Sequence, residues 1–138
     1  MSDLVVVLMI KNNKTGFLEK EIAQYRVTEN ENLIVNLFGI DLENAIEVHM
    51  KLTTDRDVED WEFSAIYDYY DDGVIKEFVK SVIPEEDCYN PTWEVVFEYD
   101  DKEAVMEEKI KTILDAHSRE LEEVYNAIKE KKEEYKEC

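Results

Sequence analysis

The residues best suited to acid–base or nucleophilic chemistry in this sequence are two histidines and two cysteines. His117 falls at the centre of the apolar stripe of a helix predicted in the C-terminal stretch, where a buried imidazole must find a hydrogen bond or stay neutral. Cys88 is the thiol with a claim to act beside it, but nothing in the spacing brings the two together. We therefore expect His117 to be a core residue. A small enzyme or ligand-binding domain with a site near His117 is the alternative.

The sequence predicts no metal ion and no cofactor. Zinc would need both histidines and both cysteines, and neither cysteine has a second ligand close by. The acidic run that begins at Asp55 starts like a calcium loop, but its sixth position is Asp60 instead of glycine and its twelfth is Ile66 instead of glutamate. The three glycines lie too far apart for a phosphate-binding loop or a dinucleotide fingerprint. No catalytic residue is assigned.

Strong acidity is the main chemical feature of the chain. Its 138 residues carry 35 Asp plus Glu against 16 Lys plus Arg, a net charge of −19. A surface of this charge repels a phosphate backbone, so direct nucleic-acid binding is excluded. Two tracts hold most of the excess: residues 55–72 have eight acids and one arginine, and residues 85–101 have seven acids and no base.

If these two tracts adjoin, they form one acidic surface that carries tryptophans. Such a surface would receive a basic protein partner, and this makes a non-enzymatic interaction or regulatory module the leading hypothesis. A decoy that imitates nucleic acid is a second alternative, and acidity that merely keeps the protein soluble is the simplest interpretation. The residues predicted to form this surface are Asp57, Asp60, Trp61, Asp68, Asp71, Trp93 and Glu94.

The C-terminal stretch from Lys102 predicts the element around which the fold is organised. Six helical steps cover the 22 positions from Met106 to Ile128, about 3.67 residues each, so the apolar stripe runs straight along one side of a helix. We expect this helix to cover a sheet, with residues 129–138 frayed or projecting into solvent. A break at 115–118, where two residue types that cap helices occur, is the alternative.

The first half of the chain predicts strands. Residues 4–10 are apolar on both faces, which implies a central strand with cover on both sides, supplied by this chain or by a second subunit in a homodimer. Residues 17–27, 33–40, 46–52 and 92–99 predict further strands, and the alternation in 46–52 puts His49 on the polar face.

Residues 58–70 fit both an alternating and a helical spacing. The aromatic content favours a strand, and a helix is the alternative. A short helix over 74–82 should stop near Pro84, and a loop should follow to Pro91. Two strand–helix units in succession would then contribute a parallel pair. The prediction is a single α+β domain over 1–138: a five- to six-stranded, mainly antiparallel sheet with a short helix and a long C-terminal helix on one face.

Three segments carry a resemblance to a known family: GFLEKEI at 16–22, WEFSAIYDYYD at 61–71 and YNPTWEVVFEY at 89–99. They resemble a small acidic family of unknown function from anaerobic Firmicutes. The resemblance extends over nearly the whole chain and implies one domain, but it supplies no catalytic residue, ligand or partner. The two cysteines, and an apolar run too short for a membrane span or a secretion signal, point to the cytoplasm.

Overall fold

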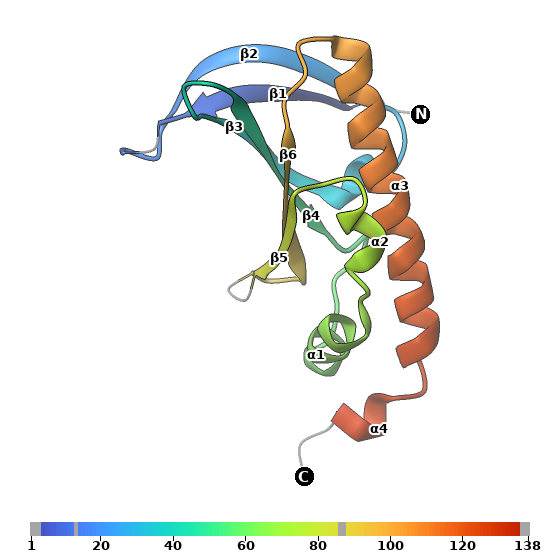
Figure 1. Cartoon of the computed structure of the whole chain (residues 1–138). Helices are drawn as coiled ribbons and strands as arrows, with labels where there is room; N and C mark the ends of the chain where they lie inside the picture. Colours follow the sequence, from blue (N-terminus) through green and yellow to red (C-terminus); the bar gives the residue numbers. More distant parts are fainter. Residues whose placement is uncertain (1–3, 13, 86–87, 136–138) are drawn as a thin grey trace.

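A computed structural model describes residues 4–12, 14–85 and 88–135 of the protein. Six strands form a single twisted sheet in the order β2-β1-β3-β4-β6-β5 (Figure 1). The strand bounds are β1 Leu4–Lys11, β2 Leu18–Val27, β3 Ile34–Asp41, β4 Ile46–Thr53, β5 Ser81–Glu85 and β6 Thr92–Glu98. The helix bounds are α1 Asp60–Tyr69, α2 Gly73–Lys76, α3 Glu103–Ile128 and α4 Lys132–Tyr135.

The sheet is mostly antiparallel. Neighbouring strands run antiparallel at four of the five pairings, and β1 pairs with β3 in parallel over three residues, Met9 with Phe38 to Lys11 with Ile40. A long C-terminal helix, several short helices and a six-stranded sheet make this an α+β domain, as the sequence predicted.

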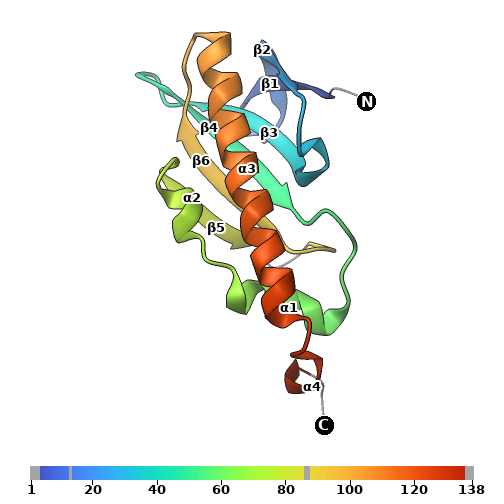
Figure 2. The ribbon, with the colours of Figure 1, turned by 90° about the vertical axis from the view of Figure 1, so that its right-hand side faces the viewer.

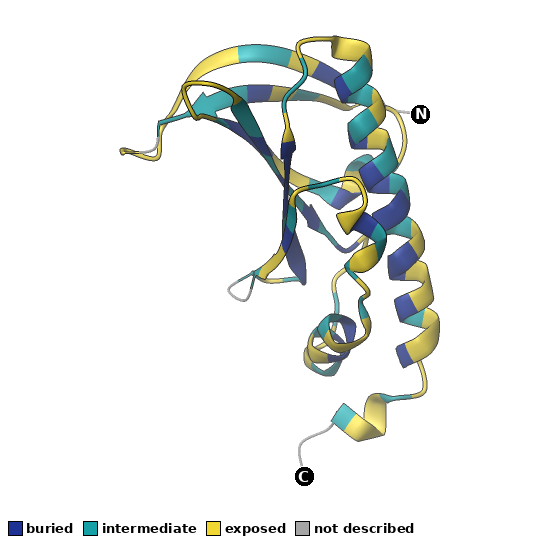
Figure 3. Ribbon diagram, viewed as in Figure 1, coloured by how far each residue is buried: buried dark blue, intermediate teal, exposed yellow. Residues whose placement is uncertain are grey.

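The core lies between the sheet and α3, which crosses one sheet face (Figures 2 and 3). Alternate residues of the central strands point toward the helix, and Val48, Met50 and Leu52 of β4 are fully buried. On α3 the apolar stripe predicted between Met106 and Ile128 is buried along its whole length. The helix is continuous through residues 115–118, so the alternative of a break there is wrong.

The segment 58–70 is a helix, and the strand prediction for it was wrong. Helix α1 begins after Glu59, whose backbone N–H donates to Glu62 Oε1 at 2.9 Å in a capping box. Ala65 and Ile66 are fully buried, so the helical spacing of the apolar residues describes this segment better than their alternation. The expected parallel pair between 61–69 and 92–99 is therefore absent, because the first of these segments is not a strand.

The helix predicted over 74–82 is also much shorter than expected. Helix α2 ends at Lys76, and the chain then enters β5, which includes Pro84 at the position where a loop was predicted. Proline lacks the N–H that a central strand needs, but β5 is at the edge of the sheet and pairs only with β6, where the missing donor is tolerated.

The described part of the tail, residues 129–135, folds back on α1 instead of extending α3 into solvent. Tyr135 of α4 donates its hydroxyl hydrogen to Asp68 Oδ2 at 2.7 Å, and Lys132 approaches the Glu59 carboxylate at 4.0 Å. The final predicted positions, 136–138, lie outside the described residues.

Candidate functional site

The residues predicted to form one acidic–aromatic surface occupy three different environments. Trp93 is only 2% exposed and stacks on Tyr70 with ring centroids 4.3 Å apart, so it belongs to the core. The alternation of β6 that buries Val95 and Phe97 under α3 buries Trp93 with them. Glu94 points to the opposite face of the sheet, where its carboxylate accepts from His49 Nδ1 at 3.1 Å.

The other predicted residues belong to α1 or flank it in the chain. Asp60, Trp61 and Asp68 belong to α1 itself, and Asp57 and Asp71 flank it. The second acidic tract diverges from this group. It begins near α1, where Tyr67 of α1 donates to the Glu85 carbonyl, but it then follows β6 to the far end of the molecule (Figure 1). The two tracts therefore meet at Glu85 and again over residues 90–93, where Asn90 donates to Asp57 at 3.0 Å, and they separate beyond Trp93.

His49, on the face away from α3, lies between two carboxylates. Its Nε2 is 3.0 Å from Glu47 Oε1 and its Nδ1 is 3.1 Å from Glu94 Oε2, while its ring stacks on Phe38 at 5.0 Å. It is on the polar face, as predicted, but is half-buried instead of fully solvated. This arrangement ties β4 to β6 across the sheet.

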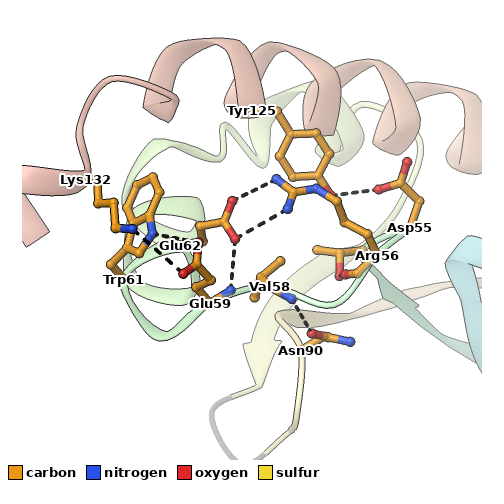
Figure 4. A network of polar contacts seen from close by, with 10 residues as sticks. Asp55, Arg56, Val58, Glu59, Trp61, Glu62, Asn90, Tyr125 and Lys132 are labelled. Atoms are coloured by element: carbon orange, nitrogen blue, oxygen red, sulfur yellow. Dashed lines mark hydrogen bonds and ion pairs between the residues drawn. The ribbon is translucent and has the colours of Figure 1, made fainter.

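A polar network fixes the loop between β4 and α1 (Figure 4). Arg56 donates to both carboxylate oxygens of Glu62, at 2.8 and 3.4 Å, and its guanidinium lies over the ring of Tyr125 at 4.4 Å. Tyr125 in turn donates to Asp55 at 2.9 Å. Burial acts to raise the pKa of Glu62, but the bonds from Arg56 and from the Glu59 backbone outweigh it and hold this pKa below its usual value. The network anchors α1 to α3.

His117 is a fully buried structural residue. Its Nδ1 accepts from the Tyr70 hydroxyl at 2.7 Å and its Nε2 donates to the Thr53 carbonyl at 2.7 Å, so both ring nitrogens are satisfied. Burial lowers its pKa to about 4. The hollows along α3 are lined by other residues.

The feature that sequence reasoning missed is a groove along α3, on the side next to α2 and Phe78. Two hollows share Phe78 as a lining residue, and the larger one encloses about 490 Å³. We call the two together the α3 groove. Its lining residues are Val74, Glu77, Phe78, Ala104, Val105, Glu108, Lys109, Thr112, Ala116, Arg119, Glu120, Glu122, Glu123 and Asn126.

Phe78 is exposed because α2 is short. Phe78 lies within the helix predicted over 74–82, but α2 ends at Lys76 and the chain turns toward β5. Phe78 is thus 46% exposed beside α3. A pattern of apolar residues cannot show that a helix ends after one turn. The groove could therefore be recognised only in the three-dimensional structure.

The α3 groove is acidic with an apolar floor. Its lining includes five glutamates and two basic residues, so the net charge of the lining is −3 (five minus two). These charged residues surround Val74, Phe78 and Ala116. Glu120 lies at its inner edge, where its carboxylate accepts from the Asp71 backbone at 2.9 Å. Burial raises the pKa of Glu120 above its usual value. The groove can hold apolar side chains and attract cationic ones.

Across the described ranges, no three or more His, Cys, Asp or Glu side chains are grouped so as to hold a metal ion. None of the described helices has the length and apolar character needed to cross a membrane.

The fold and this groove define a small acidic α+β domain with one helix-covered sheet. The chain belongs to the family of unknown function DUF6762, whose model matches residues 1–136. Comparison with curated proteins and with solved structures gives no significant match to either.

Proposed function

We propose that this domain is a non-enzymatic interaction module that binds a basic, apolar segment of a partner protein in the α3 groove. The observation that carries the proposal is Phe78, a large aromatic side chain held 46% exposed between two hollows. Aromatic residues beside a hollow are typical anchors of protein interfaces.

Charge favours a cationic partner. Glu77, Glu122 and Glu123 are exposed at the larger hollow, and α1 beside it adds the acidic tract of residues 55–72. This region attracts Lys and Arg side chains and increases the rate of encounter at low salt. The apolar floor then distinguishes a segment with apolar residues from a merely cationic one.

The test is selection of peptides from a random display library against the whole domain at physiological salt. We expect the enriched peptides to combine Lys or Arg with large apolar residues. Phe78→Ala should weaken their binding at least about tenfold, the effect of losing one anchor residue. Isothermal titration with the synthesised peptides measures this change.

The matched control is Phe17→Ala, which removes another phenylalanine, 72% exposed, from the hairpin between β1 and β2. It should leave peptide binding unchanged. Failure to enrich any peptide, or equal losses in the two variants, would reject the α3 groove as the binding site.

We infer a cytoplasmic protein of an acidic family from anaerobic Firmicutes, with Asp57, Asp60, Trp61, Asp68 and Asp71 as an outer contact zone for the basic partner.

The decoy alternative needs one continuous acidic surface. Because the acidic tracts diverge along β6, the charge distribution supports it less well than it supports the α3 groove.

A further inference from the structure

The face of the sheet away from α3, which no helix of the described chain covers, carries exposed apolar side chains among its polar ones (Figure 1). We call it the open face. Leu8 of β1 is fully buried on the α3 side, so Val7 and Met9, its neighbours along the strand, point to the open face with Val5. Val5 is 52% exposed and Val7 37%. Polar residues are the rule on the solvent side of a one-sided antiparallel sheet.

The other end of the open face carries a second exposed apolar residue. Ile83 of β5 is 52% exposed and pairs with Glu94, which is on the open face with His49. Between the two ends, Met9, Phe38, His49 and Val96 form one row across the strands. The open face therefore has apolar residues on both sides of the stacked rings of Phe38 and His49.

The two halves of the open face differ in charge. Lys11 of β1 lies over the Phe38 ring at 4.5 Å on one half. Glu85, Glu94 and Glu98 of β5 and β6 lie on the other half, where the one lysine of β4, Lys51, pairs with Glu85 at 3.1 Å and leaves an excess of negative charge. Across a protein of net charge −19, two copies can approach only where unlike charges face each other.

We propose that a second copy of this chain docks on the open face, with a twofold axis running along the strands between β3 and β4. The strand order β2-β1-β3-β4-β6-β5 then places β1 of one copy against β6 of the other, and β2 against β5. Aligned sheets pack face to face in this manner at about 30°. The half of each copy that carries Lys11 meets the acidic half of its partner.

The register makes one charge pair specific. Lys11 pairs with Ile40, Ile40 with Glu47, and Glu47 with Glu98, so Lys11 and Glu98 occupy one row at equal distances from the axis. The axis brings Lys11 of each copy opposite Glu98 of the other, twice in the dimer. Met9 and Val96, in the next row, meet in the same way.

The size of the open face suits a dimer. Six strands spaced about 4.8 Å apart and roughly 20 Å long present about 600 Å² in plan, on the order of the 800 Å² that each partner of a standard interface buries. The contact leaves the α3 groove free, so dimerisation is independent of the proposed peptide binding.

Analytical ultracentrifugation of the whole chain and of two charge variants tests the dimer. We expect the wild type to dimerise at micromolar concentration. Lys11→Glu and Glu98→Lys each create two like-charge contacts in their own homodimer, and each should raise the dissociation constant at least about tenfold. Mixing the two variants pairs unlike charges at both contacts, and the heterodimer should return to within about threefold of wild type.

The mixture also guards against misfolding, because a variant that had unfolded would not be rescued by its counterpart. Phe78→Asp, in the α3 groove, should leave the dimer intact. A monomeric wild type, a mixture that stays monomeric, or loss of the dimer in Phe78→Asp would each overturn the proposal.

Discussion

The buried contact between Tyr70 and His117 explains how this core tolerates a histidine. The imidazole stays neutral, accepts one hydrogen bond and donates another, so its polar atoms are satisfied without a charge. Trp93 packs edge-on against the His117 ring with centroids 5.3 Å apart and closes the site to water. His117 is thus the kind of core residue that the apolar stripe predicted.

The neutral state of His117 should make stability fall as pH falls. Its pKa is about 4 in the fold and 6.5 in the unfolded chain, so below pH 6.5 the unfolded chain takes up a proton that the folded protein does not. Between pH 6.5 and 5 this should lower the free energy of unfolding by about 2 kcal/mol. Urea unfolding of the wild type and of His117→Gln measures it: the variant should lack this part of the slope. Equal slopes would mean that His117 binds a proton in the folded protein as readily as in the unfolded chain.

Removing the Tyr70 hydroxyl should leave the buried His117 Nδ1 without a donor. Tyr70→Phe is expected to lower the free energy of unfolding by about 1–3 kcal/mol, the cost of an unsatisfied buried acceptor. The neighbouring Tyr69 is 39% exposed, and Tyr69→Phe should change stability by less than about 0.5 kcal/mol. If chemical denaturation gives the same value for both, the hydrogen bond contributes nothing specific.

At the scale of elements, α1 depends on Glu62 at its first turn. Glu62 is 8% exposed, caps the helix through the Glu59 N–H and binds Arg56. Glu62→Ala should therefore lower the free energy of unfolding by about 1–2 kcal/mol, because it removes a cap and leaves Arg56 unpaired. Asp60→Ala, an exposed position in the same turn, serves as the control and should stay within about 0.5 kcal/mol. Thermal denaturation followed by circular dichroism compares them.

The elements that were predictable from the sequence are those with one strong pattern. The stripe of α3 and the alternation of β4 each match a single secondary structure, and both are confirmed. Helix α1 was mistaken for a strand because the spacing of its aromatic residues fits both a helix and a strand. The capping residue Glu62 decides between the two, but in the sequence it is one of eight acidic residues in the same tract. Strand β5 was missed because Pro84 is allowed only at a sheet edge, and strand order is not visible in local sequence.

The candidate site was less predictable than the fold for a related reason. The α3 groove joins the short turn around Phe78 to α3 residues about thirty to fifty positions further along the chain. The acidic residues of each tract can be counted in the sequence, but the sequence does not show which neighbouring side chains reach the surface. Trp93 lies in an acidic tract and is nevertheless buried. Only the packing of α3 on β6 determines that.

For the whole molecule, the net charge of −19 should act against the folded state. Unfolding moves the 35 carboxylates apart, so their mutual repulsion favours the open chain, and salt screens this repulsion. Raising the sodium chloride concentration at pH 7 should therefore increase the Tm, by about 5 °C between very low ionic strength and half-molar salt. Differential scanning calorimetry at low protein concentration, where dimerisation contributes little, measures the shift.

The same titration near pH 5 separates repulsion from the ion pairs. Because the isoelectric point is about 4.3, the net charge at pH 5 is smaller than at pH 7. The rise in Tm on adding salt should therefore be smaller at pH 5. Ion pairs such as Arg56 with Glu62 act in the opposite direction, because salt weakens them. A Tm that falls with salt at pH 7 would mean that these pairs outweigh the repulsion, and that the acidic tracts are spaced widely enough to cost the fold little.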